Sequence, residues 1–119
     1  MAKKILIIDD DAELCEELAE MLKFVGHEVE TVSDGKDGEL CIRKNIYDVI
    51  ILDYRMPGLN GIEVLRSIRN EGIKAKVYVA TGRPFMERLL ENENLTDLVA
   101  GVLSKPFDAK ALLDKINAC

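Results

Sequence analysis

The segment DVIILD, residues 48–53, places four consecutive apolar residues directly before an aspartate, Asp53. A short apolar run rich in isoleucine is typical of a strand that is buried on both faces of a parallel sheet. The residues Met56, Pro57 and Gly58 follow, and they predict a turn because Pro and Gly interrupt regular structure. Asp53 is therefore expected where a buried strand emerges at the edge of a sheet.

Strand and helix patterns alternate along the whole chain around this segment. Apolar runs predict strands at residues 3–10, 27–33, 48–53, 75–81 and 98–104. Apolar residues at helical spacing predict helices at 11–25, 34–45, 62–70, 82–94 and 108–118, with Pro84 in the first turn of the fourth and Phe85 following it. Five such strand-helix units imply right-handed crossovers and a mostly parallel sheet covered by helices on both faces, which is a three-layer α/β fold.

The composition is that of one soluble domain spanning residues 1–119. Hydrophobic residues make up 48% and charged residues 32%, and no apolar run reaches the length of a membrane-spanning helix. The net charge of −6 disfavours attraction to nucleic acid phosphates and favours a basic partner or a bound cation. No secretory signal precedes Lys3 and Lys4, so a cytoplasmic location is expected.

Several single residues have simple structural interpretations. Cys15, Cys41 and Cys119 match neither a disulfide framework nor a metal site, so the first two are expected to be partly buried on helices in a reducing compartment. Asp11 is expected to cap the first helix, and His27 is expected to be a surface residue.

Polar side chains follow the predicted strands at the ends where the strands finish. Because ligands of doubly wound sheets bind outside the carboxyl ends of the strands, these side chains are expected to converge at one edge. The residues concerned are Asp9, Asp10, Asp53, Thr81, Ser104 and Lys105.

Carboxylates gathered at a partly desolvated site repel one another and need a cation. Hard oxygen ligands of this kind suit Mg²⁺, whereas the spacing of a calcium-binding loop is missing. A carboxylate can also attack phosphorus and form an aspartyl phosphate if nearby cations neutralise the charge that develops on the phosphoryl oxygens. Lys105 offers such a cation, and Thr81 offers a hydrogen-bond donor.

Over essentially its whole length the chain resembles the response regulator receiver domains of two-component signalling, the CheY-like superfamily. The resemblance rests on ILIIDDD, DVIILDYRMPGLNG, Thr81 and SKPF, which stand in the order and spacing of that family. It implies a flavodoxin-like fold and a domain that takes a phosphoryl group from a histidine kinase or a histidine phosphotransfer protein. It also implies a switch in a signalling pathway rather than a turnover enzyme, with Mg²⁺ as cofactor.

The resemblance extends to individual residues. Asp53 resembles the phosphoacceptor, Asp10 resembles a direct magnesium ligand, and Asp9 resembles its neighbour that binds directly or through water. Asp53 itself and the backbone carbonyl of Arg55 complete the implied metal site. Thr81 resembles the residue whose hydroxyl meets a phosphoryl oxygen, and Lys105 resembles the lysine that pairs with that group. The bond between Lys105 and Pro106 resembles one that is cis in the family.

Two departures from the family pattern concern the output of the switch. Val102 occupies a position where the family commonly has Tyr or Phe, and a stiff β-branched side chain cannot repeat an aromatic in-and-out movement. The segment 91–101, ENENLTDLVAG, also differs from the usual entry to the last strand. Both departures lie on the expected docking face for a downstream protein, formed by helix 82–94, strand 98–104 and helix 108–118.

Two alternatives to the phosphorylated switch remain open at this point. One is a receiver-like binding module that works without phosphorylation. The other is a phosphohydrolase that uses Asp53 as its nucleophile, which is disfavoured because Arg55 stands where such enzymes carry a second acid. No DNA-binding or enzymatic segment follows the last helix, so either a stand-alone receiver or one cut from a longer protein is expected.

Overall fold

The computed structural model describes residues 2–55, 59–106 and 108–117. The predicted turn at Met56, Pro57 and Gly58 and the third cysteine, Cys119, lie outside the described residues. The strands are β1 (Lys4–Ile8), β2 (Glu28–Val32), β3 (Val49–Asp53), β4 (Lys76–Thr81) and β5 (Val99–Ser104). The helices are α1 (Ala12–Phe24), α2 (Gly35–Lys44), α3 (Gly61–Asn70), α4 (Met86–Asn92), the short 3₁₀ helix η1 (Thr96–Leu98) and α5 (Ala109–Asn117).

All strand pairs are parallel, and the order across the sheet is β2-β1-β3-β4-β5. The predicted α/β fold with a doubly wound parallel sheet is therefore confirmed. β3 lies at the centre, and each of its five residues is buried, as its unbroken apolar sequence predicts. Because all strands run in the same direction, their carboxyl ends meet at one edge of the sheet.

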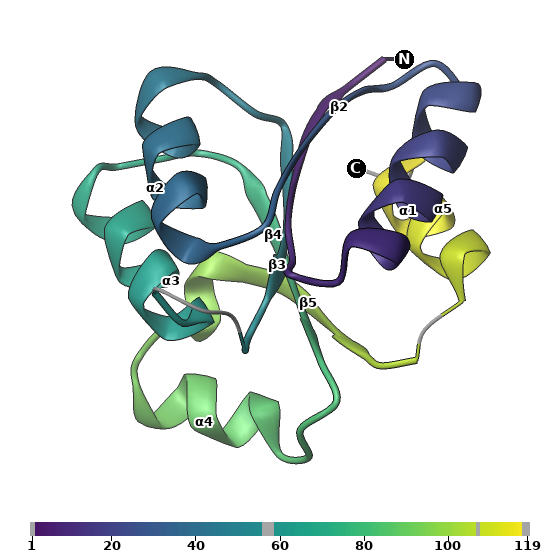
Figure 1. Ribbon diagram of the computed structural model, residues 1–119. Helices are drawn as coiled ribbons and strands as arrows, with labels where there is room; N and C mark the ends of the chain where they lie inside the picture. The colour runs from purple at the N-terminus through teal and green to yellow at the C-terminus, as the bar shows by residue number, and fades with distance from the viewer. Residues whose placement is uncertain (1, 56–58, 107, 118–119) are drawn as a thin grey trace.

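The helices cover both faces of the sheet (Figure 1). On one face, Leu18 and Leu22 of α1 and Leu112 and Ile116 of α5 pack against residues of the central strands. On the other face, α2, α3 and α4 pack through a larger cluster that includes Ile42, Leu65 and Leu90. Among the described residues, no helix is both long and apolar enough to cross a bilayer.

The fourth helix begins later than the sequence predicts. α4 starts at Met86, so Pro84 is not in its first turn. Phe85 adopts a left-handed backbone conformation with φ of 62°, which cannot belong to a right-handed helix, and the residue is 75% exposed. The expectation that the helical segment runs from residue 82 is therefore wrong, and residues 82–85 form a loop after β4.

The prediction that His27 is a surface residue is also wrong. Only 6% of His27 is exposed, because both ring nitrogens have partners within the fold. Nδ1 accepts a hydrogen bond from the Lys3 backbone N–H at 3.1 Å, and Nε2 lies 3.2 Å from Oδ1 of Asn117 at the end of α5. An imidazole with both nitrogens satisfied is buried at little cost.

Candidate functional site

Three carboxylates from two neighbouring strands meet at the carboxyl edge of the sheet. Asp53 is the last residue of β3, and Asp9 and Asp10 follow β1 directly. One oxygen from each of the three side chains lies within 4.8 Å of the other two. Asp9 and Asp53 are buried, whereas Asp10 is exposed, so the cluster opens to solvent on one side.

The side chain of Asp9 is held in place from two directions. Its Oδ1 accepts the Asp11 backbone N–H at 3.0 Å, and its Oδ2 accepts from Lys105 Nζ at 2.9 Å. Asp11 in turn accepts the Leu14 N–H at 3.1 Å and caps α1, as its position in the sequence predicts. The start of α1 therefore orients Asp9 toward the cluster.

Lys105 reaches the cluster from the end of β5. Its backbone N–H donates to the Thr81 carbonyl at 2.7 Å, and the peptide bond to Pro106 is cis, as expected from the family resemblance. Its Nζ lies 2.9 Å from Asp9 Oδ2 and 3.3 Å from Asp53 Oδ1. Burial alone lowers the pKa of Lys105, but the hydrogen bond to Asp9 and the charges of Asp53 and Asp9 outweigh it and leave that pKa raised.

The negative charge of the cluster is only partly neutralised by Lys105. Burial, and then repulsion by Asp9, raise the pKa of Asp53 to about 6, although Lys105 opposes both effects. A carboxyl group with this pKa is ionised at neutral pH only at a cost in free energy. The set of three carboxylates therefore fits a small hard cation such as Mg²⁺, which prefers oxygen ligands and removes this cost.

Thr81 lies beside Asp53 at the end of β4, and its side chain is buried. Its Oγ1 accepts the backbone N–H of Arg83 at 2.9 Å. Because a hydroxyl accepts through a lone pair and donates through its hydrogen, this contact leaves the Thr81 hydrogen available for an oxygen placed near Asp53. Asp53, Thr81 and Arg83 line a cavity of about 450 Å³ together with Tyr54, Arg55 and Gly82.

Two residues that line this cavity, Tyr54 and Arg83, were not predicted from the sequence. The Arg83 guanidinium lies over the ring of Tyr54, with Cζ 5.5 Å from the ring centroid and Nη1 3.3 Å from the phenol oxygen. Tyr54 directly follows Asp53, and Arg83 stands two residues after Thr81. The position of Arg83 in a polar loop directly after an apolar strand could have indicated that it lies near the site. Its contact with Tyr54 has no such local signal, because it depends on the pairing of β3 with β4.

The remaining predicted residues lie close to the cavity or behind it. Arg55 is exposed and lines the cavity, while the role of its carbonyl as a metal ligand stays a prediction. Val102 of β5 pairs with Val79 and is packed against the apolar cluster that contains α4. Ser104 is in register with Thr81 but exposed.

Cys15 lies behind the acidic cluster on α1, and Cys41 is half-buried on α2, as predicted. The Cys15 thiol donates to the Asp9 carbonyl at 3.3 Å. Burial, together with the nearby charge of Asp9, raises the pKa of the Cys15 thiol to about 11. A thiol with this pKa stays protonated at neutral pH and serves packing rather than chemistry.

Comparison with known proteins agrees with this geometry. Residues 5–117 match the family model of the response regulator receiver domain. The response regulator MprA of Mycobacterium sp. (strain KMS) is 36% identical over 121 residues, which cover 99% of this chain and 50% of the relative. The chain thus spans about half the length of the curated relatives it matches.

Two solved structures are similar over nearly the whole chain. The chemotaxis response regulator CheY4 of Vibrio cholerae superposes with a TM-score of 0.87 at 28% identity, covering 99% of this chain and 98% of that one. The response regulator TrrA of Thermotoga maritima, solved in complex with Mg²⁺-BeF, superposes with a TM-score of 0.82 at 28% identity. That similarity covers 98% of this chain and 97% of TrrA.

Proposed function

This chain belongs to the response regulator receiver domain family, and from that membership we propose that Asp53 accepts a phosphoryl group from a phosphohistidine of a histidine kinase or a histidine phosphotransfer protein. The observation that carries the proposal is the arrangement around Asp53. Its carboxylate lies with Asp9 and Asp10 in one cluster, and Lys105 Nζ reaches it at 3.3 Å.

The proposed transfer forms one bond and breaks one bond. An oxygen of Asp53 attacks phosphorus, a P–O bond forms, and the P–N bond to the donor imidazole breaks. The leaving imidazole keeps the electron pair of that bond and takes up a proton. Burial of β3 fixes Asp53 in position for an in-line approach from the cavity side. Lys105 and the Thr81 hydroxyl then bind oxygens of the new phosphoryl group.

The proposed cofactor is Mg²⁺, held by Asp9, Asp10 and Asp53 and by the carbonyl of Arg55. When bound, the ion neutralises charge on the carboxylates and on the phosphoryl oxygens. The raised pKa of Asp53 supports a cation site, because a bound cation favours the ionised form that attacks phosphorus. The Mg²⁺-BeF complex of TrrA supports the same type of site in a structural relative.

We further propose that residues 1–119 act as a single receiver domain in the cytoplasm and signal through a protein partner. The proposed docking face is the α4-β5-α5 face, without direct contact to nucleic acid or membrane. The free thiols of Cys15 and Cys41 support a reducing compartment, and the net charge of −6 disfavours phosphate backbones as partners.

The decisive experiment is labelling with a small phosphodonor. Acetyl phosphate with Mg²⁺ should add one phosphoryl group to the wild type, as seen by intact mass, and none to Asp53→Asn. Chelation of the metal should abolish labelling. Equal labelling of the variant at another site would overturn the assignment of Asp53, and many turnovers of a generic phosphate ester per protein would instead favour the phosphohydrolase.

The metal site has a matched control in the same acidic run. Mg²⁺ at one hundred times its dissociation constant should stabilise the wild type by about 2.7 kcal/mol. Asp10→Asn should lose most of this stabilisation, whereas Asp11→Asn should keep it, because Asn caps a helix as well as Asp does. An equal response of the two variants would contradict the proposed ligand set.

A further inference from the structure

Among the described residues, β2 is an edge strand of the sheet, because it stands at one end of the strand order and pairs with β1 alone (Figure 1). The Glu28 N–H donates to the Lys3 carbonyl at 2.9 Å, and the Val32 carbonyl accepts the Asp9 N–H at 3.1 Å. Both residues therefore direct these groups toward β1. Since successive residues of a strand point their backbone groups to opposite sides, Val29 and Thr31 direct theirs outward.

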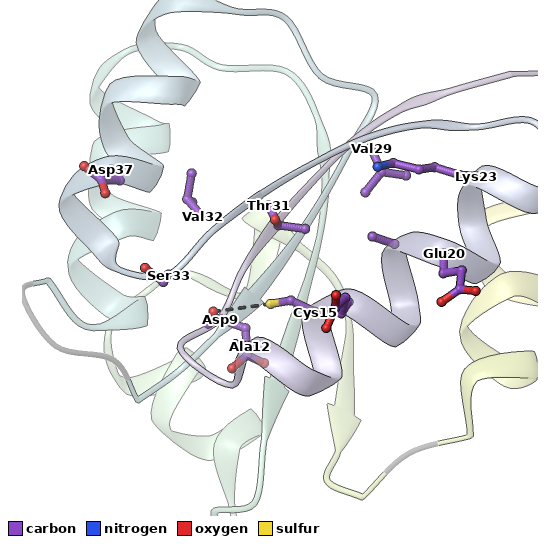
Figure 2. A pocket seen from close by; sticks show the side chains of 12 residues that line it. Asp9, Ala12, Cys15, Glu20, Lys23, Val29, Thr31, Val32, Ser33 and Asp37 are labelled. Atoms are coloured by element: carbon purple, nitrogen blue, oxygen red, sulfur yellow. Dashed lines mark hydrogen bonds between the residues drawn. The ribbon is translucent and has the colours of Figure 1, made fainter.

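A groove runs along this edge between β2 and α1, with a volume of about 640 Å³ (Figure 2). Val29 and Thr31 line it from the strand, and Ala12, Cys15 and Ala19 line it from the helix. These helix residues are small, so the space beside the strand is not filled by α1. The outward backbone groups of Val29 and Thr31 and the apolar residues that line the groove therefore lie on the same surface.

The surface around the groove is acidic. Glu16, Glu20 and Asp37 lie on its lining, where Lys23 is the only basic residue among those described. Within the described part of the chain, no ion pair involves any of these three acids. Exposed Glu28 adds a further negative charge on the strand itself. A segment that pairs with β2 is therefore favoured if it is basic.

The same charges disfavour a second copy of this chain as the occupant. Antiparallel pairing of two β2 strands centred on Val29 would set Glu28 of each copy opposite Glu30 of the other, and like charges in opposed positions destabilise a sheet. Lys4 pairs with Glu30 at 3.6 Å and reduces this repulsion only in part. Acidic residues at an edge are a common protection against such self-association. The charge pattern thus selects a different protein.

We propose that this edge binds an extended basic segment of a partner protein, which adds to the sheet as a strand beside β2. The backbone of the segment pairs with Val29 and Thr31, and its apolar side chains enter the groove next to Ala19. The Lys or Arg side chains of the segment point to the opposite face of the sheet, beside Glu28. Glu16 and Glu20, which line the groove, attract the positive charge of the segment. Asp9 also lines this groove, so the groove adjoins the acidic cluster, but Val29, Thr31, Glu16 and Glu20 take no part in the phosphoryl transfer proposed at Asp53.

The test uses a peptide of alternating Lys and Val, acetylated and amidated, titrated into the ¹⁵N-labelled chain. The amide signals of Val29 and Thr31 should shift, and their hydrogen exchange should slow. A peptide of alternating Glu and Val should have no effect. Absence of binding of the basic peptide at millimolar concentration, or shifts centred on another surface, would overturn the proposal, as would dimerisation of the chain through β2.

Two variants separate backbone pairing from charge attraction. Thr31→Pro removes the outward N–H, which an edge strand tolerates, and it should weaken binding at least about tenfold. The control Thr31→Val keeps the N–H and should bind as the wild type does. The pair Glu16→Lys with Glu20→Lys should also weaken binding, and it provides the test if Thr31→Pro does not fold. Equal binding by all variants would contradict the assignment, and labelling of Asp53 by acetyl phosphate should be unchanged in the two Thr31 variants.

Discussion

Lys105 donates a hydrogen bond from Nζ to Oδ2 of Asp9 at 2.9 Å, and this contact joins the end of β5 to the end of β1. Two strands, β3 and β4, separate β1 from β5 in the sheet. The long side chain of Lys105 therefore extends across the carboxyl edge and lies above Asp53 on its way, at 3.3 Å. The Lys105 ammonium therefore partly neutralises the negative charge of Asp9 and Asp53 when neither a metal nor a phosphoryl group is bound.

Lys105→Ala should impair switching more than metal binding. The three carboxylates that form the proposed magnesium site remain, and loss of a competing cation should leave the dissociation constant of Mg²⁺ unchanged or lower it. In the phosphorylated protein, the fraction of molecules that show the shifted amide signals of α4 and β5 should fall at least about tenfold, because the phosphoryl oxygens lose their cationic partner. Calorimetry measures the first effect, and NMR with acetyl phosphate measures the second.

Lys110→Ala is the matched control, because Lys110 is an exposed lysine on α5. It should behave as the wild type does in both measurements. A Lys105→Ala protein that switches fully would contradict the role given to this ammonium.

Asp53→Asn should stabilise the metal-free protein at neutral pH. Burial and repulsion by Asp9 raise the pKa of Asp53 from 3.8 to about 6, so the folded state binds this proton more tightly than the unfolded state does. The carboxyl group therefore adds stability below pH 4, and that contribution is lost as the pH rises through 6. The uncharged amide avoids the loss, and the gain at pH 7.5 should be at most about 3 kcal/mol.

Urea unfolding in the presence of a chelator measures this effect at a series of pH values. The difference in the free energy of unfolding between Asp53→Asn and wild type should shrink as the pH falls from 7 to 4. Added Mg²⁺ should also reduce the difference at pH 7.5, since it stabilises only the carboxylate form. A difference that is independent of pH would show that Asp53 does not titrate as described.

The sequence was sufficient for the sheet and for the convergence of Asp9, Asp10, Asp53 and Lys105. Buried parallel strands leave a direct signal, because unbroken apolar runs occur where both faces are covered. Position at a strand end then determines which polar residues meet, so local pattern and topology together predict the cluster. The capping role of Asp11 is equally local.

The failures concern residues whose environment comes from distant parts of the chain. His27 is buried because Lys3 and Asn117 satisfy its ring, and neither contact has a signal in the surrounding sequence. The start of α4 depends on the left-handed conformation of Phe85, although Pro84 is compatible with a first helical turn. Tyr54 and Arg83 meet only because β3 pairs with β4.

Gly35→Ala should destabilise the fold by about 1–3 kcal/mol, the usual range for overpacking. Helix propensity alone predicts the opposite, because Ala favours a helix by up to about 1 kcal/mol over Gly. A Cβ at Gly35 would lie 2.2 Å from the carbonyl oxygen of Leu59, which is backbone and cannot move aside cheaply. Thermal or urea unfolding distinguishes the two expectations by the sign of the change.

Gly82→Ala is a suitable control for this substitution. A Cβ at Gly82 would meet no atom within 4 Å, and the residue lies outside the helices and strands. Its free energy of unfolding should therefore stay close to that of the wild type. An equal free energy of unfolding for Gly35→Ala and Gly82→Ala would contradict the close approach of α2 to the loop that contains Leu59.

Arg83→Ala should slow labelling of Asp53 by acetyl phosphate severalfold. The guanidinium lies over Tyr54 at the cavity that contains Asp53 and Thr81, and it is exposed at the entrance. A positive charge there raises the local concentration of an anionic donor against the negative net charge of −6. Because this attraction acts through solvent, added salt should reduce the difference between the variant and the wild type.

The measurement is the second-order rate constant of labelling at low and at high ionic strength. Arg88→Ala is the matched control, since Arg88 is also an exposed arginine over an aromatic ring, that of Phe85, but does not line the cavity. Its rate constant should equal that of the wild type at both ionic strengths. A rate constant for Arg83→Ala that is lower by the same factor at all salt concentrations would assign the effect to the lost contact of the guanidinium with Tyr54 rather than to charge. An unchanged rate constant would show that the guanidinium plays no part in attracting the donor.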